Sequence, residues 1–153
     1  YNLPEGAKLY LYNKDYSQIL GAYTSLNNKS YQQLATSFIA SNTLIIELFI
    51  PLKVKADWSL SISKISHDYT GVFLKDGRFK KSGNCNIDVN CINSNSVQDL
   101  KNAVSRIIID GKYICTASLI NNIKQDGKPY IITAKHCMYE TGNTWVFNFN
   151  YES

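Results

Sequence analysis

Four cysteines and one histidine in the second half of the sequence could take part in chemistry. Cys85, Cys91, Cys115 and Cys137 make an even number, and His136 directly precedes the last of them in YIITAKHCMYE. Imidazole gains and loses a proton near neutral pH. Cysteines pair into disulfides in oxidising compartments, and their thiolates bind zinc. The residue types therefore allow a disulfide framework, a zinc site or a histidine that transfers protons.

The spacing of these residues disfavours a zinc site. Finger and ribbon sites usually bring their ligands in close pairs such as CxxC, whereas Cys85 and Cys91 are separated more widely and the other two cysteines are distant. His136 and Cys137 are adjacent, and adjacent side chains on a strand point in different directions. We therefore expect no metal ion and no other cofactor.

A disulfide between Cys115 and Cys137 fits the pattern better. The two residues lie at comparable points of two β-prone runs, YICTASLIN and YIITAKHC. If these runs are antiparallel neighbours, the bridge closes a loop of 22 residues (137 − 115 = 22). Such a loop is worth roughly 3 kcal/mol in the chain-entropy model. The bridge would also fix the backbone beside His136.

The sequence contains a second histidine, which serves as a comparison. His67 follows a strand-like run, has Asp68 beside it and is expected on the surface. Nothing near it indicates catalysis. A lone histidine is more often structural than catalytic, so composition alone leaves the role of His136 open.

The elements that must position these residues are expected to be β-strands. The chain is 44% hydrophobic and 12% aromatic, and aromatic residues favour strands. Five runs separated by polar turns read as strands: 8–13, 19–24, 34–40, 43–50 and 58–66. The last run alternates strictly and predicts a core set of Trp58, Leu60, Ile62 and Ile65. Residues 1–73 are therefore predicted to form a small β-sandwich-like domain.

A basic stretch, LKDGRFKKSGN, separates this part from a second module. It spans residues 74–84, contains two glycines and is predicted to be a linker. In the second module, 85–153, the Asp110-Gly111 pair predicts a hairpin with a type I′ turn. VQDLKNA reads as a helical turn, and PYIITA and TWVFNFNYE read as further strands.

Charge and hydropathy exclude two classes of partner. The net charge is +4, but lysines and arginines are scattered rather than gathered in a stripe, so no nucleic-acid partner is expected. No apolar run reaches the roughly 20 residues that a membrane-spanning helix needs. The sequence begins at Tyr1 without a signal-peptide pattern, and we expect it to be a processed product or a fragment.

Three stretches of the second module resemble a known family. TAKHC resembles the TA-x-H-C stretch around the general-base histidine of trypsin-like serine proteases. CTASLINN and SGNCNIDVNC resemble the C-T-G-S-L-[VI]-N-N and SGSCNIDVVC stretches of the bacterial lysyl endopeptidase branch of those proteases. The stretches occur in the same order at matching distances, and the resemblance extends over about residues 82–151. Upstream, the β-rich pattern resembles the propeptide that precedes such enzymes.

The resemblance implies the first part of a chymotrypsin-like β-barrel, incomplete in this chain. It implies that His136 is the general base and that the disulfide joins Cys115 to Cys137. It matches Cys85 and Cys91 to cysteines whose partners lie outside the chain.

The same resemblance implies that residues 1–153 are not active alone. The catalytic aspartate and serine of the family lie beyond residue 153. Ser105 and Ser118 stand in strand-like runs without the glycine-rich turn of a nucleophile, so neither is expected to replace that serine. Ala117 departs from the family's usual glycine, which a strand tolerates.

The function implied is that of a secreted bacterial serine endopeptidase zymogen that cleaves peptides, after lysine by family likeness. Lys80 and Lys81 form a candidate processing site at which the enzyme would release its own propeptide. Partners would be peptide substrates of the complete enzyme, the remainder of the protease or a larger surface complex. The alternative is a non-catalytic β-rich binding module of an extracellular or surface assembly.

Overall fold

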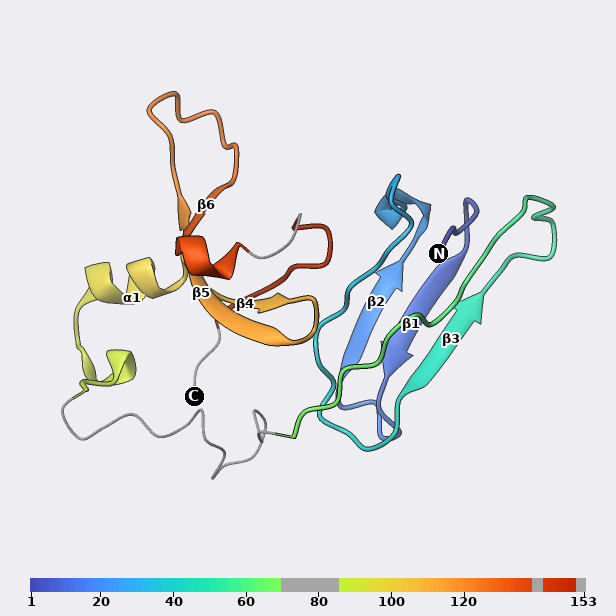
Figure 1. The fold of residues 1–153 in the computed structure, drawn as a ribbon, viewed down its shortest axis with the longest axis horizontal. Coiled ribbons are helices and arrows are strands. Elements are labelled where there is room, and N and C mark those ends of the chain that lie inside the picture. The colour runs from blue at the N-terminus through green and yellow to red at the C-terminus, as the bar shows by residue number, and fades with distance from the viewer. Residues whose placement is uncertain (70–85, 139–141, 151–153) are drawn as a thin grey trace. The chain divides into compact units, whose positions relative to one another are not determined.

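The computed structural model describes residues 1–69, 86–138 and 142–150 (Figure 1). The chain divides into two compact units, Tyr1–Ile65 and Ser66–Ser153. Each unit is built around one antiparallel sheet, and helix is confined to short segments. The predicted all-β class is confirmed.

The first unit contains a three-stranded antiparallel sheet in the order β2-β1-β3. Its strands are β1 (Lys8–Tyr12), β2 (Ile19–Tyr23) and β3 (Ile45–Phe49), and a 3-10 turn, η1 (Ser25–Asn27), follows β2. In β1, Leu9 and Leu11 are buried and Tyr10 on the other face is less so. This alternation results from the two-residue period of a strand, and it places one apolar face of the sheet on the core.

The core of the first unit is small and wholly apolar. Its buried members are Leu3, Ala7, Leu9 and Leu11, against which Leu20, Tyr23, Leu34, Ile39, Leu48 and Leu60 pack among others. Most of these residues come from the three strands or from the segment that leads into β1. The burial of their apolar surface is the main term that stabilises this unit.

Two of the predicted strands do not form. Residues 34–40 have no strand structure, although Leu34 and Ile39 still pack against the core. Residues 58–66 contribute only an isolated bridge between Ser59 and Asn2.

The core set predicted for the second of these runs is correspondingly wrong. Trp58 is 50% exposed, Ile62 61% and Ile65 78%, and only Leu60 packs against the core. An alternating run becomes a strand only when a partner strand pairs with it, and this run pairs at a single residue. The described part of the first unit therefore has one sheet and no second packed layer.

The second unit contains a four-stranded antiparallel sheet in the order β6-β5-β4-β7. Its elements are η3 (Val89–Cys91), α1 (Asn95–Lys101), β4 (Val104–Ile109), β5 (Tyr113–Ile120), β6 (Tyr130–Thr133), η4 (Lys135–Cys137) and β7 (Val146–Phe149). The predicted helical turn, hairpin and two later strands are all present. The predicted linker, 74–84, lies outside the described residues, so the domain boundaries stay a prediction.

The hairpin of β4 and β5 is the centre of this sheet. Asp110 and Gly111 both have positive φ, 51° and 62°, which is the backbone of a type I′ turn. The strands pair in register from Val104 opposite Ser118 to Ile109 opposite Tyr113. The turn signal in the sequence therefore predicts the position of the hairpin. In the observed register the connection is three residues long, Asp110, Gly111 and Lys112.

One face of the hairpin forms the core of the second unit. Its buried members are Ile107, Ile109, Ala117 and Cys137, and Cys115, Ile131 and Trp145 pack against them. Ile107 lies directly opposite Cys115 in the register, so these side chains share a face. No helix of the described residues is long and apolar enough to cross a membrane.

Candidate active site

His136 lies in the short turn that comes after the edge strand β6. β6 ends at Thr133, whose hydroxyl donates to the carbonyl of Thr116 in β5 at 2.8 Å. The 3-10 turn η4 then begins, closed by a hydrogen bond from the Cys137 amide to the Ala134 carbonyl at 2.9 Å. The turn reverses the chain so that the His136 ring is exposed while Cys137 is only 3% exposed.

A disulfide ties this turn to the centre of the sheet. Cys137 is bonded to Cys115 of β5, with 6.2 Å between the two Cα atoms. The bridge closes the 22-residue loop that the sequence predicts, and loops of this length are worth about 3 kcal/mol in the chain-entropy model. Since both sulfurs belong to or border the core, the backbone on one side of His136 is fixed.

The imidazole lies beside this disulfide. One of its nitrogens and the two sulfur atoms of Cys115 and Cys137 all lie within 4.8 Å of one another. Within the part of the chain that the structure describes, no hydrogen bond or ion pair engages the imidazole. The backbone of His136 is thus fixed by the turn and the bridge, and its side chain is exposed to solvent.

The loop between β5 and β6 sets where β6 begins. The side chain of Asn122 donates to the Asp126 carboxylate at 2.6 Å, and the Lys128 amide donates to it at 3.2 Å. These hydrogen bonds, the one from Asn122 first, lower the pKa of Asp126 below its usual value. The carboxylate therefore stays ionised and organises the turn that returns the chain to the sheet.

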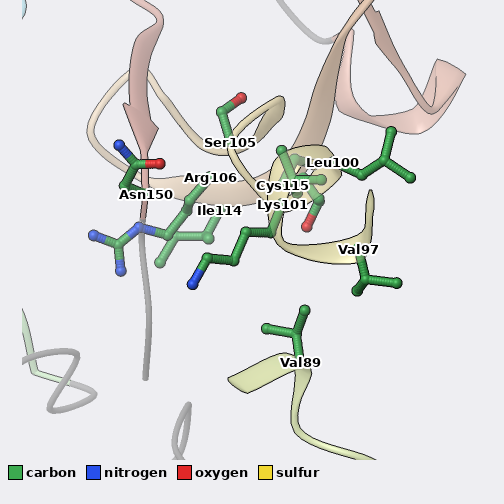
Figure 2. Close-up of a pocket in the computed structure, with 11 residues that line it drawn as sticks. Val89, Val97, Leu100, Lys101, Ser105, Arg106, Ile114, Cys115 and Asn150 are labelled. Carbon is green, nitrogen blue, oxygen red and sulfur yellow. The ribbon is translucent and has the colours of Figure 1, made fainter. Parts of the chain in front are cut away.

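An apolar pocket of about 530 Å³ lies between η3 and α1 on one side and β4 and β5 on the other (Figure 2). Val89, Val97, Leu100, Val104 and Ile114 supply most of its apolar lining. Lys101 and Arg106 add two positive charges, and no acidic residue lines it. Sequence reasoning missed the pocket, and the one available signal was Arg106, which interrupts an otherwise apolar strand.

The pocket does not include His136. Arg106 pairs with Thr116, one step out of phase with the Ile107–Cys115 pair. Since successive side chains on a strand point to opposite faces, Arg106 lies on the face opposite the core. The histidine ring therefore lies outside the pocket, although Cys115, one half of the disulfide beside that ring, is among the residues that line it.

Neither strand serine is placed as a nucleophile. Ser105 is only 1% exposed, and its hydroxyl lies 3.5 Å from the Ala117 carbonyl. Ser118 lies within β5 and is half-buried. A serine that attacks a substrate must reach it from a surface, and a buried core hydroxyl does not.

The other predicted residues are not gathered at the histidine turn. Cys91 ends η3, is exposed and has a free thiol. His67 is exposed in the segment after the first unit's sheet. Cys85, Lys80 and Lys81 lie outside the described residues, so their roles stay predictions.

Comparison with known proteins relates the second unit to lysyl endopeptidases. Residues 79–153 match the family model described as "Lysyl endopeptidase, C-terminal domain". The chain is also 27% identical over 128 residues to a lysyl endopeptidase of Pseudomonas aeruginosa, an alignment that includes 72% of this chain. No solved structure matches the chain.

The two matches include different amounts of the chain. The chain spans 28% of the length of the Pseudomonas relative. Within this chain, 72% of 153 residues is about 110, which exceeds the 75 residues from 79 to 153. The similarity to the lysyl endopeptidase therefore extends upstream of the region that the family model matches.

Proposed function

We propose that the protein is a serine endopeptidase of the lysyl-endopeptidase type and that His136 is its general base. The observation that carries the proposal is the position of this histidine. It is exposed at the end of an edge strand, beside a disulfide, within the residues that match the family model. An exposed imidazole on a fixed backbone is what proton transfer to and from a bound substrate requires.

In this chemistry the imidazole takes the proton of a serine hydroxyl as that oxygen attacks the peptide carbonyl. It then gives the proton to the leaving amine. A carboxylate holds the ring in the correct tautomer. Residues 1–153 contain no serine in a Gly-x-Ser-Gly turn, so the proposal requires the serine and the carboxylate to come from other residues of the whole protein. On this proposal residues 1–153 do not hydrolyse peptides alone.

We assign the first unit a propeptide-like role and residues 85–153 to the first part of the protease domain. The upstream extent of the similarity to the lysyl endopeptidase supports a shared precursor organisation. A protease that cuts after lysine would then release the first unit at Lys80 or Lys81. Intact-mass measurement of the protein after maturation tests this assignment, and a new N-terminus far from Ser82 contradicts it.

The disulfide supports a secreted, extracytoplasmic location, since structural disulfides persist in oxidising compartments and are rare in the cytosol. The substrate class proposed is peptide or protein, with lysine before the cleaved bond. The lysine preference rests on the family likeness of residues 79–153.

The experiment compares His136→Ala with His67→Ala in the whole protein that contains residues 1–153. We expect His136→Ala to lower kcat for a lysine-containing peptide by about 10⁴-fold or more. His67→Ala should leave kcat unchanged, because His67 is not among the residues gathered with the disulfide at the histidine turn. Peptides with arginine or leucine in place of the lysine measure the preference.

Two outcomes would overturn the proposal. Activity that survives His136→Ala would remove this histidine from the mechanism. A whole protein that binds peptides or surface partners but hydrolyses none would favour the alternative, a non-catalytic β-rich binding module.

A further inference from the structure

The histidine turn brings together three groups that bind soft metal ions. Nitrogen of His136 and sulfur of Cys115 and Cys137 lie within 4.8 Å of one another. Adjacent residues 136 and 137 were expected to point apart as on a strand, but they lie in a 3-10 turn instead. The backbone therefore allows the two side chains to share one site.

A tetrahedral zinc site needs ligand atoms further apart than two bonded sulfurs. Zn–S bonds are about 2.3 Å and Zn–N bonds about 2.0 to 2.1 Å, so tetrahedral ligand atoms lie about 3.5 to 3.8 Å apart. Bonded sulfurs lie about 2.05 Å apart, so reduction must let them separate by about 1.7 Å, while the nitrogen must approach by at most about 1.3 Å. While the sulfurs are bonded to each other, they are not thiolates, and only the thiolate is an effective metal ligand.

We propose that reduction of the Cys115–Cys137 disulfide creates a site for one Zn²⁺, with the two cysteine thiolates and His136 as ligands. With a water-soluble phosphine as reductant, phosphorus is oxidised to the phosphine oxide. Water supplies its oxygen and the two protons that convert the disulfide to two thiols. Zinc then replaces both thiol protons, which are released to solvent. Water fills the fourth position, as in open zinc sites.

Each cysteine also has backbone contacts that do not depend on the bridge. Cys115 is fixed in β5 opposite Ile107, and the Cys137 amide is bonded to Ala134 within η4. Cys137 is buried, where an unpaired thiolate would be costly to desolvate. A divalent ion offsets that cost, and the exposed His136 ring gives the ion a route from solvent.

One consequence rests on the proposed function. A ring nitrogen bound to zinc cannot accept a proton from a serine. Reduced protein would therefore be held inactive by zinc until the metal leaves and the disulfide forms. The metal site itself does not depend on His136 being a catalytic base, and metal binding can be measured without any activity.

The test uses residues 1–153 with Cys85→Ser and Cys91→Ser, so that Cys115 and Cys137 are the remaining cysteines. The reduced protein is titrated with Co²⁺, whose visible d–d bands report tetrahedral coordination, and Zn²⁺ then displaces the cobalt. We expect one equivalent to bind after reduction and none before it. His136→Ala should weaken the affinity by at least about tenfold and change the d–d bands, while His67→Ala should change neither.

Circular dichroism, recorded during the titration, shows whether reduction unfolds the sheet. If reduction lowers the sheet signal, one equivalent of zinc should restore it, because the binding free energy then contributes to folding. The proposal is overturned if the reduced protein gives no tetrahedral cobalt spectrum, if zinc fails to restore a lost sheet signal, or if His136→Ala leaves both affinity and spectrum unchanged.

Discussion

The two units stabilise similar small sheets by different means. Both are single antiparallel sheets with a core of four buried residues. In the first unit these are all aliphatic residues, and no cysteine lies in that part of the sequence. In the second unit one of the four is Cys137, which is bonded to a neighbour of the same core. The covalent bridge is thus placed where, on the proposed function, a side chain must also be held for chemistry.

Removing a core side chain should give the largest effect and should test whether the units unfold separately. Leu9→Ala and Ile107→Ala each remove a buried aliphatic group and should cost about 2 to 5 kcal/mol of unfolding free energy through the cavity that remains. Urea unfolding measures both. Trp58→Phe leaves Trp145, which packs on the second core, as the fluorescent reporter of that unit. The urea midpoint reported by Trp145 fluorescence should fall in Ile107→Ala and stay the same in Leu9→Ala. If Leu9→Ala lowers this midpoint as much as Ile107→Ala does, the two units do not unfold independently.

Removal of the disulfide should have the next largest effect on stability. Cys115→Ser with Cys137→Ser should lower the unfolding free energy of the second unit by about 3 kcal/mol, since the unfolded chain regains the freedom of the 22-residue loop. Cys91→Ser is the matched control, because Cys91 is exposed with a free thiol, and it should change little. Equal urea midpoints for the double variant and its control would contradict the assigned role of the bridge.

Turn glycines should give a smaller, matched pair of effects. Gly111 in the hairpin of the second unit has φ +62°, and Gly6 in the first unit has φ +81°. Alanine at Gly6 should cost about 1 kcal/mol, because a Cβ atom strains the left-handed backbone. Alanine at Gly111 should cost more, because its Cβ would also clash with the Ser66 hydroxyl oxygen. Thermal unfolding of each variant measures the cost. If Gly111→Ala does not destabilise the second unit, the type I′ turn does not hold its register.

The smallest predicted effect is a change in the stability of the first unit at high pH. The Tyr12 hydroxyl donates to the Glu47 carboxylate at 2.7 Å, and this bond raises the pKa of Tyr12 to about 12. Because the folded pKa lies above the unfolded value of 10.0, the contribution is fully present below pH 10. It is lost as the pH rises toward 12. NMR titration of the tyrosine rings should find a lower Tyr12 pKa in Glu47→Gln and no change in Glu5→Gln.

Local signals predicted the second unit better than the first. The Asp110-Gly111 pair predicts where the chain turns between β4 and β5, although the connection has one residue more, Lys112, than a two-residue turn. The register of these strands, together with the position of β6, brings Cys115 and Cys137 close enough to bond. The hairpin depends on residues near one another in sequence, so the sequence predicts its position, whereas the register is known only from the structure.

Predictions for the first unit failed where pairing depends on distant partners. Trp58, Leu60 and Ile62 alternate as in a strand. Among the described residues, however, this run pairs only through Ser59 with Asn2 and adds to neither outer strand of the sheet. The pocket was missed for a similar reason. Lys101 and Arg106 belong to different elements, and only the packing of α1 near the sheet brings them together.

The outer strands of both sheets have a consequence for assembly. Among the described residues, β2 and β3 end one sheet and β6 and β7 end the other, so each carries backbone amides and carbonyls along an open side. Such rows recruit any further extended segment that reaches them. Within the described residues, these four outer strands are therefore the places where an extended segment, from elsewhere in the whole protein or from a second copy, would add by backbone pairing.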